Sequence, residues 1–149
     1  MMISNTIDQE IKQAMLAKDQ AKLRGLRAIK AAFLLAKTEK GQAEELNEEA
    51  EIKILQRLVK QRKESANIYQ EQGREDLLKV EQEEIEVIGA FLPQQLDLTT
   101  IEAIVSKIIA ETGAVSVKEM GKVMGLANKE LAGKADGKLI GEIVKSLLH

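Results

Sequence analysis

Apolar residues recur at intervals of three and four along nearly all of the 149-residue chain, which is the spacing of amphipathic helices. No segment has the pattern of a strand. The sequence therefore predicts an all-α protein. One helix is expected over about 75–92, and the others are expected to begin at or directly after residues that can cap a helix, namely Thr6, Asp19, Asn47, Thr99, Ser116 and Asp136.

Pro93, the only proline, divides the expected helices into two groups. Before it, we expect a domain over residues 1–92 in which long helices pack side by side. After it, helices that end at Gly113 and Gly133, followed by a last helix, predict a compact three-helix bundle over residues 93–149. The chain is thus expected to contain two helical domains.

Composition excludes several kinds of site. Cysteine is absent, so the chain can form no disulfide, thiol nucleophile or thiolate zinc site. The 22 basic and 24 acidic residues give a formal charge of −2, so nucleic acid could be bound only through a local patch. One tyrosine and two phenylalanines are too few for base-stacking platforms, which leaves recognition through shape and phosphates.

The sequence predicts no catalytic residue, no metal site and no cofactor. The only histidine, His149, is the last residue, where a positioned general base is not expected. The acidic clusters Glu44–Glu51 and Glu81–Glu86 are interpreted as solvated parts of a linker and of helix surfaces. The chain shows neither a targeting segment nor a run of about eighteen apolar residues, so we expect a cytoplasmic protein without membrane contact.

Basic positions on one face of a C-terminal helix are the most informative, since steps of four, three and four join Lys118, Lys122, Gly125 and Lys129. One interpretation is a solvated lysine face with a glycine that lets a neighbouring helix pack closely. The other is a strip that contacts phosphates, in which Gly125 lets a backbone approach and Lys134 and Lys138 extend the positive surface. The residues alone leave both interpretations open.

Two other basic segments are weaker candidates. Residues 133–138 (GKADGK) place glycines before a helix, as a phosphate loop does, but only three residues separate the glycines and Leu139 follows the last lysine. Asp136 would also occupy the N–H groups as a cap. Residues 60–63 (KQRK) lie in the middle of a long helix, where a charge run is typical of solvation and salt bridges.

Several segments resemble the YqeY family in their order and spacing. They are residues 60–65 (KQRKES), Tyr69 with Gly73-Arg74, and residues 91–96 (FLPQQL), 120–125 (MGKVMG) and 133–138 (GKADGK). The C-terminal half is also similar to the tail domain of the B subunit of the tRNA-dependent amidotransferase, which contacts the tRNA body. This resemblance implies an all-helical fold and a tRNA-related role, with the five lysines named above as positions to test.

The resemblance does not imply catalysis by this chain. In the amidotransferase, the transamidation site and the glutaminase belong to other parts of the enzyme, so a label of carbon–nitrogen ligase with glutamine as amido donor would be inherited by association. Our leading hypothesis is a non-catalytic, tRNA- or translation-associated helical module. The alternatives are a protein-interaction adaptor that binds a partner helix in grooves between the N-terminal helices, and a part of a carbon–nitrogen ligase system.

Overall fold

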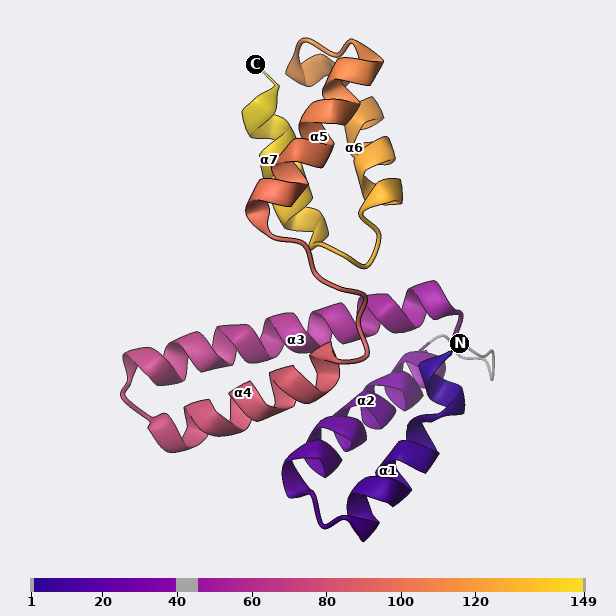
Figure 1. The fold of residues 1–149 in the computed structure, drawn as a ribbon, viewed down its shortest axis with the longest axis vertical. Coiled ribbons are helices and arrows are strands. Elements are labelled where there is room, and N and C mark those ends of the chain that lie inside the picture. Colours follow the sequence, from indigo (N-terminus) through magenta and orange to yellow (C-terminus); the bar gives the residue numbers. More distant parts are fainter. Residues whose placement is uncertain (1, 40–45, 149) are drawn as a thin grey trace. The chain divides into compact units, whose positions relative to one another are not determined.

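The fold is entirely helical within the described residues, 2–39 and 46–148 of a computed structural model (Figure 1). This confirms the all-α prediction. In chain order the elements are η1 (Ile3–Asn5), α1 (Ile7–Leu16), α2 (Gln20–Glu39), α3 (Glu48–Glu71), α4 (Glu75–Gly89), α5 (Leu98–Thr112), η2 (Val117–Glu119), α6 (Met120–Glu130) and α7 (Gly137–Leu147).

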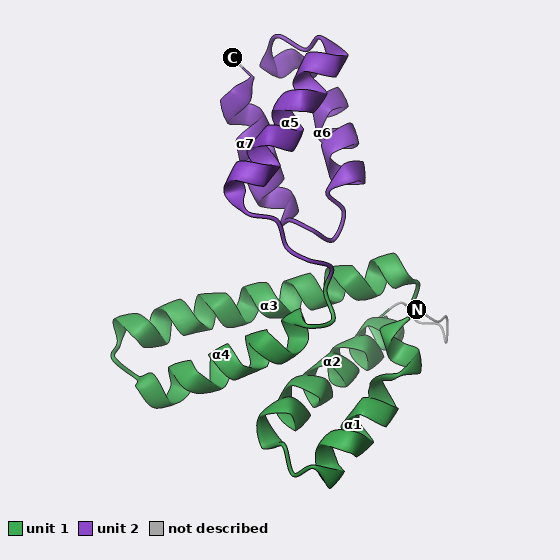
Figure 2. Cartoon of the chain, in the orientation of Figure 1, with its two compact units in different colours: residues 1–92 green, residues 93–149 purple. Residues whose placement is uncertain are grey.

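Two compact units make up the chain, residues 1–92 and residues 93–149, here called unit 1 and unit 2 (Figure 2). Each has its own apolar core. Over the described parts of the chain, no helix is both long enough and apolar enough to span a membrane.

Unit 1 consists of two helical hairpins, α1 with α2 and α3 with α4 (Figure 1). The hairpins meet where α4 packs against α2, and Leu26, Leu55 and Ile88 are fully buried in the shared core. Contact between the two helices is very close at Gly25, because a Cβ placed there would lie 2.6 Å from a methyl carbon of Val87. Glycine is therefore the residue that lets α2 and α4 approach this closely.

All the aromatic side chains of the protein belong to unit 1. Phe33 is buried in the core of unit 1. Phe91, in the segment after α4, packs against this core. Tyr69 is half-buried in the last turns of α3. The core of unit 2 is consequently aliphatic.

Ile7, Ile11 and Met15 follow one another at four-residue spacing on α1, but only part of this apolar stripe is buried. Ile7 is buried and Ile11 is half-buried, but Met15 is 55% exposed and Ala14 is buried in its place. A helix turns 100° per residue, so a four-residue step drifts by 40° and carries the stripe off the buried face over two turns. Met15 therefore lies at the edge of this face.

Glu51 contradicts the prediction of a solvated acidic segment. Its side chain is completely buried, whereas Glu48 and Glu49 are exposed, and Glu44 and Glu45 lie outside the described residues. The two Glu51 carboxylate oxygens accept hydrogen bonds from the backbone N–H groups of Ile3, at 2.8 Å, and Ser4, at 3.1 Å. A buried carboxylate on the first turn of η1 satisfies donors that a helix start leaves unpaired.

The acidic cluster on α4 also differs from its prediction, since Glu81, Glu83 and Glu84 are half-buried and only Glu86 is exposed. Glu83 accepts a hydrogen bond from the Arg24 guanidinium at 2.9 Å. Burial raises the pKa of Glu81, and the neighbouring Glu84 carboxylate adds to this rise. These side chains face helix contacts because α4 packs on both α2 and α3.

Arg62, the charged residue within the apolar positions of α3, faces α4. Its Nε lies 3.5 Å from a Glu84 carboxylate oxygen, a distance that gives an ion pair without a hydrogen bond. Both side chains are mostly buried, with 18% and 16% of their surface exposed. The basic segment 60–63 is thus divided, because its two lysines are exposed and its arginine is part of the α3–α4 contact.

Unit 2 is a bundle of α5, α6 and α7 around an aliphatic core that includes Ile101, Val123 and Val144. In this unit, two of the expected caps differ from the prediction. Asp97, rather than Thr99, begins α5 by accepting a hydrogen bond from the Thr100 N–H at 2.8 Å. Ser116 makes no side-chain cap, because residues 117–119 form a 3₁₀ turn before α6. In unit 1, Thr6 also makes no side-chain hydrogen bond to the helix that follows it. Side-chain caps are formed as expected by Asp19, Asn47 and Asp136.

Candidate nucleic-acid interface

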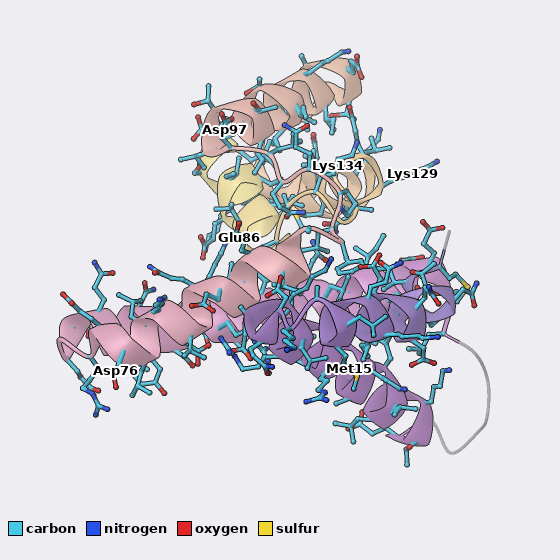
Figure 3. All side chains as sticks on the ribbon, turned by 60° about the horizontal axis from the view of Figure 1, so that its bottom comes forward. Met15, Asp76, Glu86, Asp97, Lys129 and Lys134 are labelled. Carbon is cyan, nitrogen blue, oxygen red and sulfur yellow. The ribbon has the colours of Figure 1, made fainter. Side chains whose placement is uncertain are left out.

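Part of the predicted lysine set lies on one exposed side of α6 in unit 2. Lys122, Gly125 and Lys129 follow one side of α6, and Lys118 lies directly before this helix, in η2. Gly121 shares this side, four residues before Gly125. All five residues are exposed, and Figure 3 shows the Lys129 side chain projecting away from α6. We call these residues, 118, 121, 122, 125 and 129, the lysine–glycine face.

The lysines of this face make no ion pair with any carboxylate of the described residues. Three acidic side chains of unit 2 instead accept hydrogen bonds from backbone N–H groups. Asp97 accepts from Thr100, Glu119 from Val115 at 3.0 Å, and Asp136 from Lys138 at 3.3 Å. The unit contains seven basic and seven acidic residues, so its positive potential is local to the surfaces where lysines gather.

Gly125 does not serve to bring a neighbouring helix close. A Cβ placed on Gly125 or on Gly121 would meet no atom within 4 Å among the described residues. Within unit 2, therefore, no helix packs closely through Gly125, whereas close packing through glycine occurs at Gly25 in unit 1. A glycine inside a helix costs about 1 kcal/mol relative to alanine, and no packing contact offsets that cost at Gly125.

Lys134 and Lys138 lie beyond the C-terminal end of α6, in the connection to α7 and in its first turn. Both side chains are exposed. The backbone carbonyl of Lys134 accepts a hydrogen bond from the Leu96 N–H at 3.0 Å, and the neighbouring Gly133 carbonyl accepts one from the Gln95 amide at 2.7 Å. The turn that carries Lys134 is therefore fixed to the segment that enters α5.

The connection over residues 133–138 lacks the geometry of a phosphate loop. Asp136 caps α7 by accepting a hydrogen bond from the Lys138 N–H, so its carboxylate occupies a backbone donor that an anion would need and places a negative charge there. Gly133 has a positive φ of 76°, which fits its predicted role in ending the preceding helix. No three His, Asp or Glu side chains of the described ranges are grouped so that they could hold a metal ion, and His149 lies outside these ranges.

Sequence reasoning missed a pocket in unit 1 with a volume of about 550 Å³. Residues from α1, α2, α4 and the segments beside them line it. Its lining is partly apolar and partly charged, and it consists of Glu10, Asp19, Ala21, Lys22, Glu83, Glu86, Val87, Ala90 and Phe91. These residues are separated by up to about eighty positions in the chain, so no local motif could have indicated the pocket.

Comparison with known proteins agrees with the family resemblance given above. The family model described as YqeY-like protein matches residues 4–148. The chain belongs to the YqeY-like protein family.

Two curated relatives are proteins named altered inheritance of mitochondria protein 41, mitochondrial. The protein from Vanderwaltozyma polyspora is 31% identical over 125 residues, which cover 76% of this chain and 64% of the relative. The protein from Meyerozyma guilliermondii is 30% identical over 129 residues, which cover 84% of this chain and 66% of the relative. The match thus spans about two thirds of each relative's length. Their names place these two proteins in mitochondria and mention no ligand or reaction.

Proposed function

We propose that unit 2 is a non-catalytic module that binds the phosphate backbone of tRNA through the lysine–glycine face. The observation that carries this proposal is the face itself, on which lysines without carboxylate partners among the described residues lie beside two helical glycines where an added Cβ would meet no atom within 4 Å. A phosphate backbone fits both features, because it supplies negative charge and benefits from close access to the helix. The resemblance of the C-terminal half to the tRNA-contacting tail domain supports tRNA as the nucleic acid.

Binding of this kind is modest in strength and independent of base sequence. Lys118, Lys122 and Lys129 are the central contacts, and Lys134 and Lys138 are outer positions that can meet phosphates farther along the backbone. Each phosphate that a lysine neutralises releases counterions, so the affinity falls steeply as salt increases. Different tRNAs should consequently bind about equally well.

The first test is a filter-binding salt titration with tRNA, comparing the wild type with Lys118→Ala, Lys122→Ala and Lys129→Ala. Each substitution should weaken binding and lower the slope of log affinity against log salt by roughly one. Lys107→Ala is the matched control, because Lys107 is an exposed lysine of the same unit on α5. Wild-type binding that is undetectable near ~50 mM salt, or an equal effect of Lys107→Ala, would contradict the proposal.

The second test concerns access to the helix at Gly125. Gly125→Gln adds a neutral side chain that protrudes from the face without removing a charge, so it should weaken tRNA binding about threefold or more. Gly89→Gln is the matched control, since Gly89 is a helical glycine of unit 1 with no neighbour within 4 Å. Unchanged binding by Gly125→Gln would show that the backbone does not approach α6.

We propose no reaction for this chain alone, because its sequence offers no cysteine and its single histidine is the last residue. The purified protein should not amidate misacylated tRNA in the presence of glutamine and ATP. Turnover that disappeared on a point substitution within the chain would contradict this expectation and favour the carbon–nitrogen ligase alternative.

A further inference from the structure

The pocket of unit 1 is lined by both charged and apolar residues, which come from several helices. α1 contributes Glu10, the start of α2 contributes Ala21 and Lys22, and α4 contributes Glu83, Glu86 and Val87. Its volume of about 550 Å³ is within the range of pockets that bind ligand groups. Its apolar lining, here called the apolar wall, consists of Ala21, Val87, Ala90 and Phe91.

The charges around this pocket are unbalanced. The Nζ atom of Lys22 lies 3.5 Å from a carboxylate oxygen of Glu10. The Nη2 atom of Arg24 lies 2.9 Å from a carboxylate oxygen of Glu83, so both carboxylates have cationic partners. Asp19 accepts a hydrogen bond from the Lys22 N–H, but no Lys or Arg of the described residues pairs with it or with Glu86. The pocket therefore combines an apolar wall with two carboxylates that lack a cation, and Figure 3 labels Glu86 on α4.

We propose that this pocket docks a basic amphipathic helix of a partner protein. An apolar side chain of that helix would contact Val87, Ala90 and Phe91, and a lysine or arginine one turn away would pair with Glu86 or Asp19. The long alkyl stem of a basic side chain also suits an apolar wall with a charged rim. Nucleic acids and anionic lipid surfaces are disfavoured as occupants, because their phosphates would face carboxylates.

The experiment uses the full chain and a defined probe, a fluorescein-labelled helical peptide of about 18 residues, or five turns, patterned from leucine and lysine. We expect saturable binding by fluorescence anisotropy. Addition of the peptide to isotope-labelled protein should shift the backbone NMR signals of Lys22, Glu86 and Ala90. A peptide with serine in place of leucine should bind at least about tenfold more weakly, because it keeps the charge and loses the apolar contact.

Two charge-reversal variants locate the contact. Glu86→Lys should weaken binding of the leucine–lysine peptide at least about tenfold, whereas Glu71→Lys should change it less than about twofold. Both residues are exposed and the changes in net charge are identical, but Glu71 ends α3, beside the turn into the opposite end of α4. Circular dichroism would verify that both variants keep the wild-type helix content.

Several outcomes would overturn the inference. If the leucine–lysine peptide does not bind saturably, or if the serine–lysine peptide binds equally well, the result contradicts the proposal. Equal losses of peptide affinity in Glu86→Lys and Glu71→Lys, or NMR shifts confined to residues outside the pocket, contradict it as well. A dimer that competes with the peptide would assign the pocket to a second copy of this chain instead. Because the tRNA proposal rests on unit 2 alone, this inference can fail without affecting it.

Discussion

The two units of this protein use their charged residues in different ways. In unit 1, basic side chains pair with acidic ones across helices, as Arg24 does with Glu83 and Arg62 with Glu84. In unit 2, Lys107 pairs with Glu111 on the same helix at 4.0 Å, and the other lysines are exposed. Unit 1 thus pairs some of its buried and half-buried charges across helices, whereas unit 2 leaves exposed lysines available to a partner.

The helical glycines show the same contrast. Gly25 of unit 1 is buried against Val87, so its missing side chain is explained by the contact between α2 and α4. Gly121 and Gly125 of unit 2 face open space, so nothing within the unit explains them. A residue that weakens its own helix without a packing contact is a stronger indication of function than one that permits packing.

The largest expected effect is on unit 1, from Glu51→Ala. This change leaves the N–H groups of Ile3 and Ser4 without a buried acceptor and creates a cavity, so it should cost about 2–4 kcal/mol of unfolding free energy. Glu49→Ala is the matched control and should cost within about 0.5 kcal/mol, because Glu49 is exposed and its ion pair with Lys53 lies on the surface. Urea denaturation measures both, and equal costs would contradict the structural role of Glu51.

Gly25→Ala should destabilise unit 1 by about 1–3 kcal/mol although alanine favours a helix. The added methyl group would lie 2.6 Å from Val87 Cγ1, so α2 and α4 must move apart. The double variant Gly25→Ala with Val87→Ala should recover part of this loss, because the shorter side chain at 87 makes room. A stabilised single variant in thermal denaturation would show that the two helices are not this close.

Gly125→Ala should have the opposite sign and stabilise unit 2 by about 1 kcal/mol. The new methyl group meets no neighbour, and only the helix preference changes. Hydrogen exchange of the α6 amides would detect the gain locally. A loss of stability would indicate that Gly125 has a packing role that the structure does not show.

The smallest expected effects concern pH and again differ between the units. Hydrogen bonds from the Thr100 side chain, and then from its backbone N–H, lower the pKa of Asp97. A lowered folded-state pKa gives stability that is present above the unfolded value, ~3.9, and is lost as pH falls through the lower folded value. Asp97→Asn should therefore be less stable than the wild type at neutral pH, and this difference in stability should become smaller below about pH 4. Thermal melts that follow unit 2 measure it.

Glu81 should behave in the reverse manner, because burial and the Glu84 carboxylate raise its pKa. A carboxyl group with a raised folded-state pKa destabilises the fold at high pH, and this cost is absent below the unfolded value, ~4.3. Glu81→Gln should slightly stabilise unit 1 at neutral pH, with no gain remaining at about pH 4. A gain that is constant with pH would assign the effect to something other than ionisation.

The periodicity of apolar residues was sufficient to predict the helices, because each one needs only a local stripe and local capping groups. It also placed Lys122 and Lys129 on one side of α6, since residues on one helix are placed by their spacing alone. The burial of Glu51 could not be predicted in this way, because its partners, Ile3 and Ser4, lie 48 and 47 positions away. The pocket of unit 1 was missed for the same reason.

Because all aromatic residues belong to unit 1, optical spectroscopy can distinguish the two units. Tyr69 is the only tyrosine and tryptophan is absent, so intrinsic fluorescence and near-ultraviolet circular dichroism report on unit 1 alone. Far-ultraviolet circular dichroism reports on both units. The difference between the two signals during a melt therefore follows unit 2 without a label. A single tryptophan introduced at exposed Leu126, beside the lysine–glycine face, would report tRNA binding through its fluorescence, because the chain contains no other tryptophan.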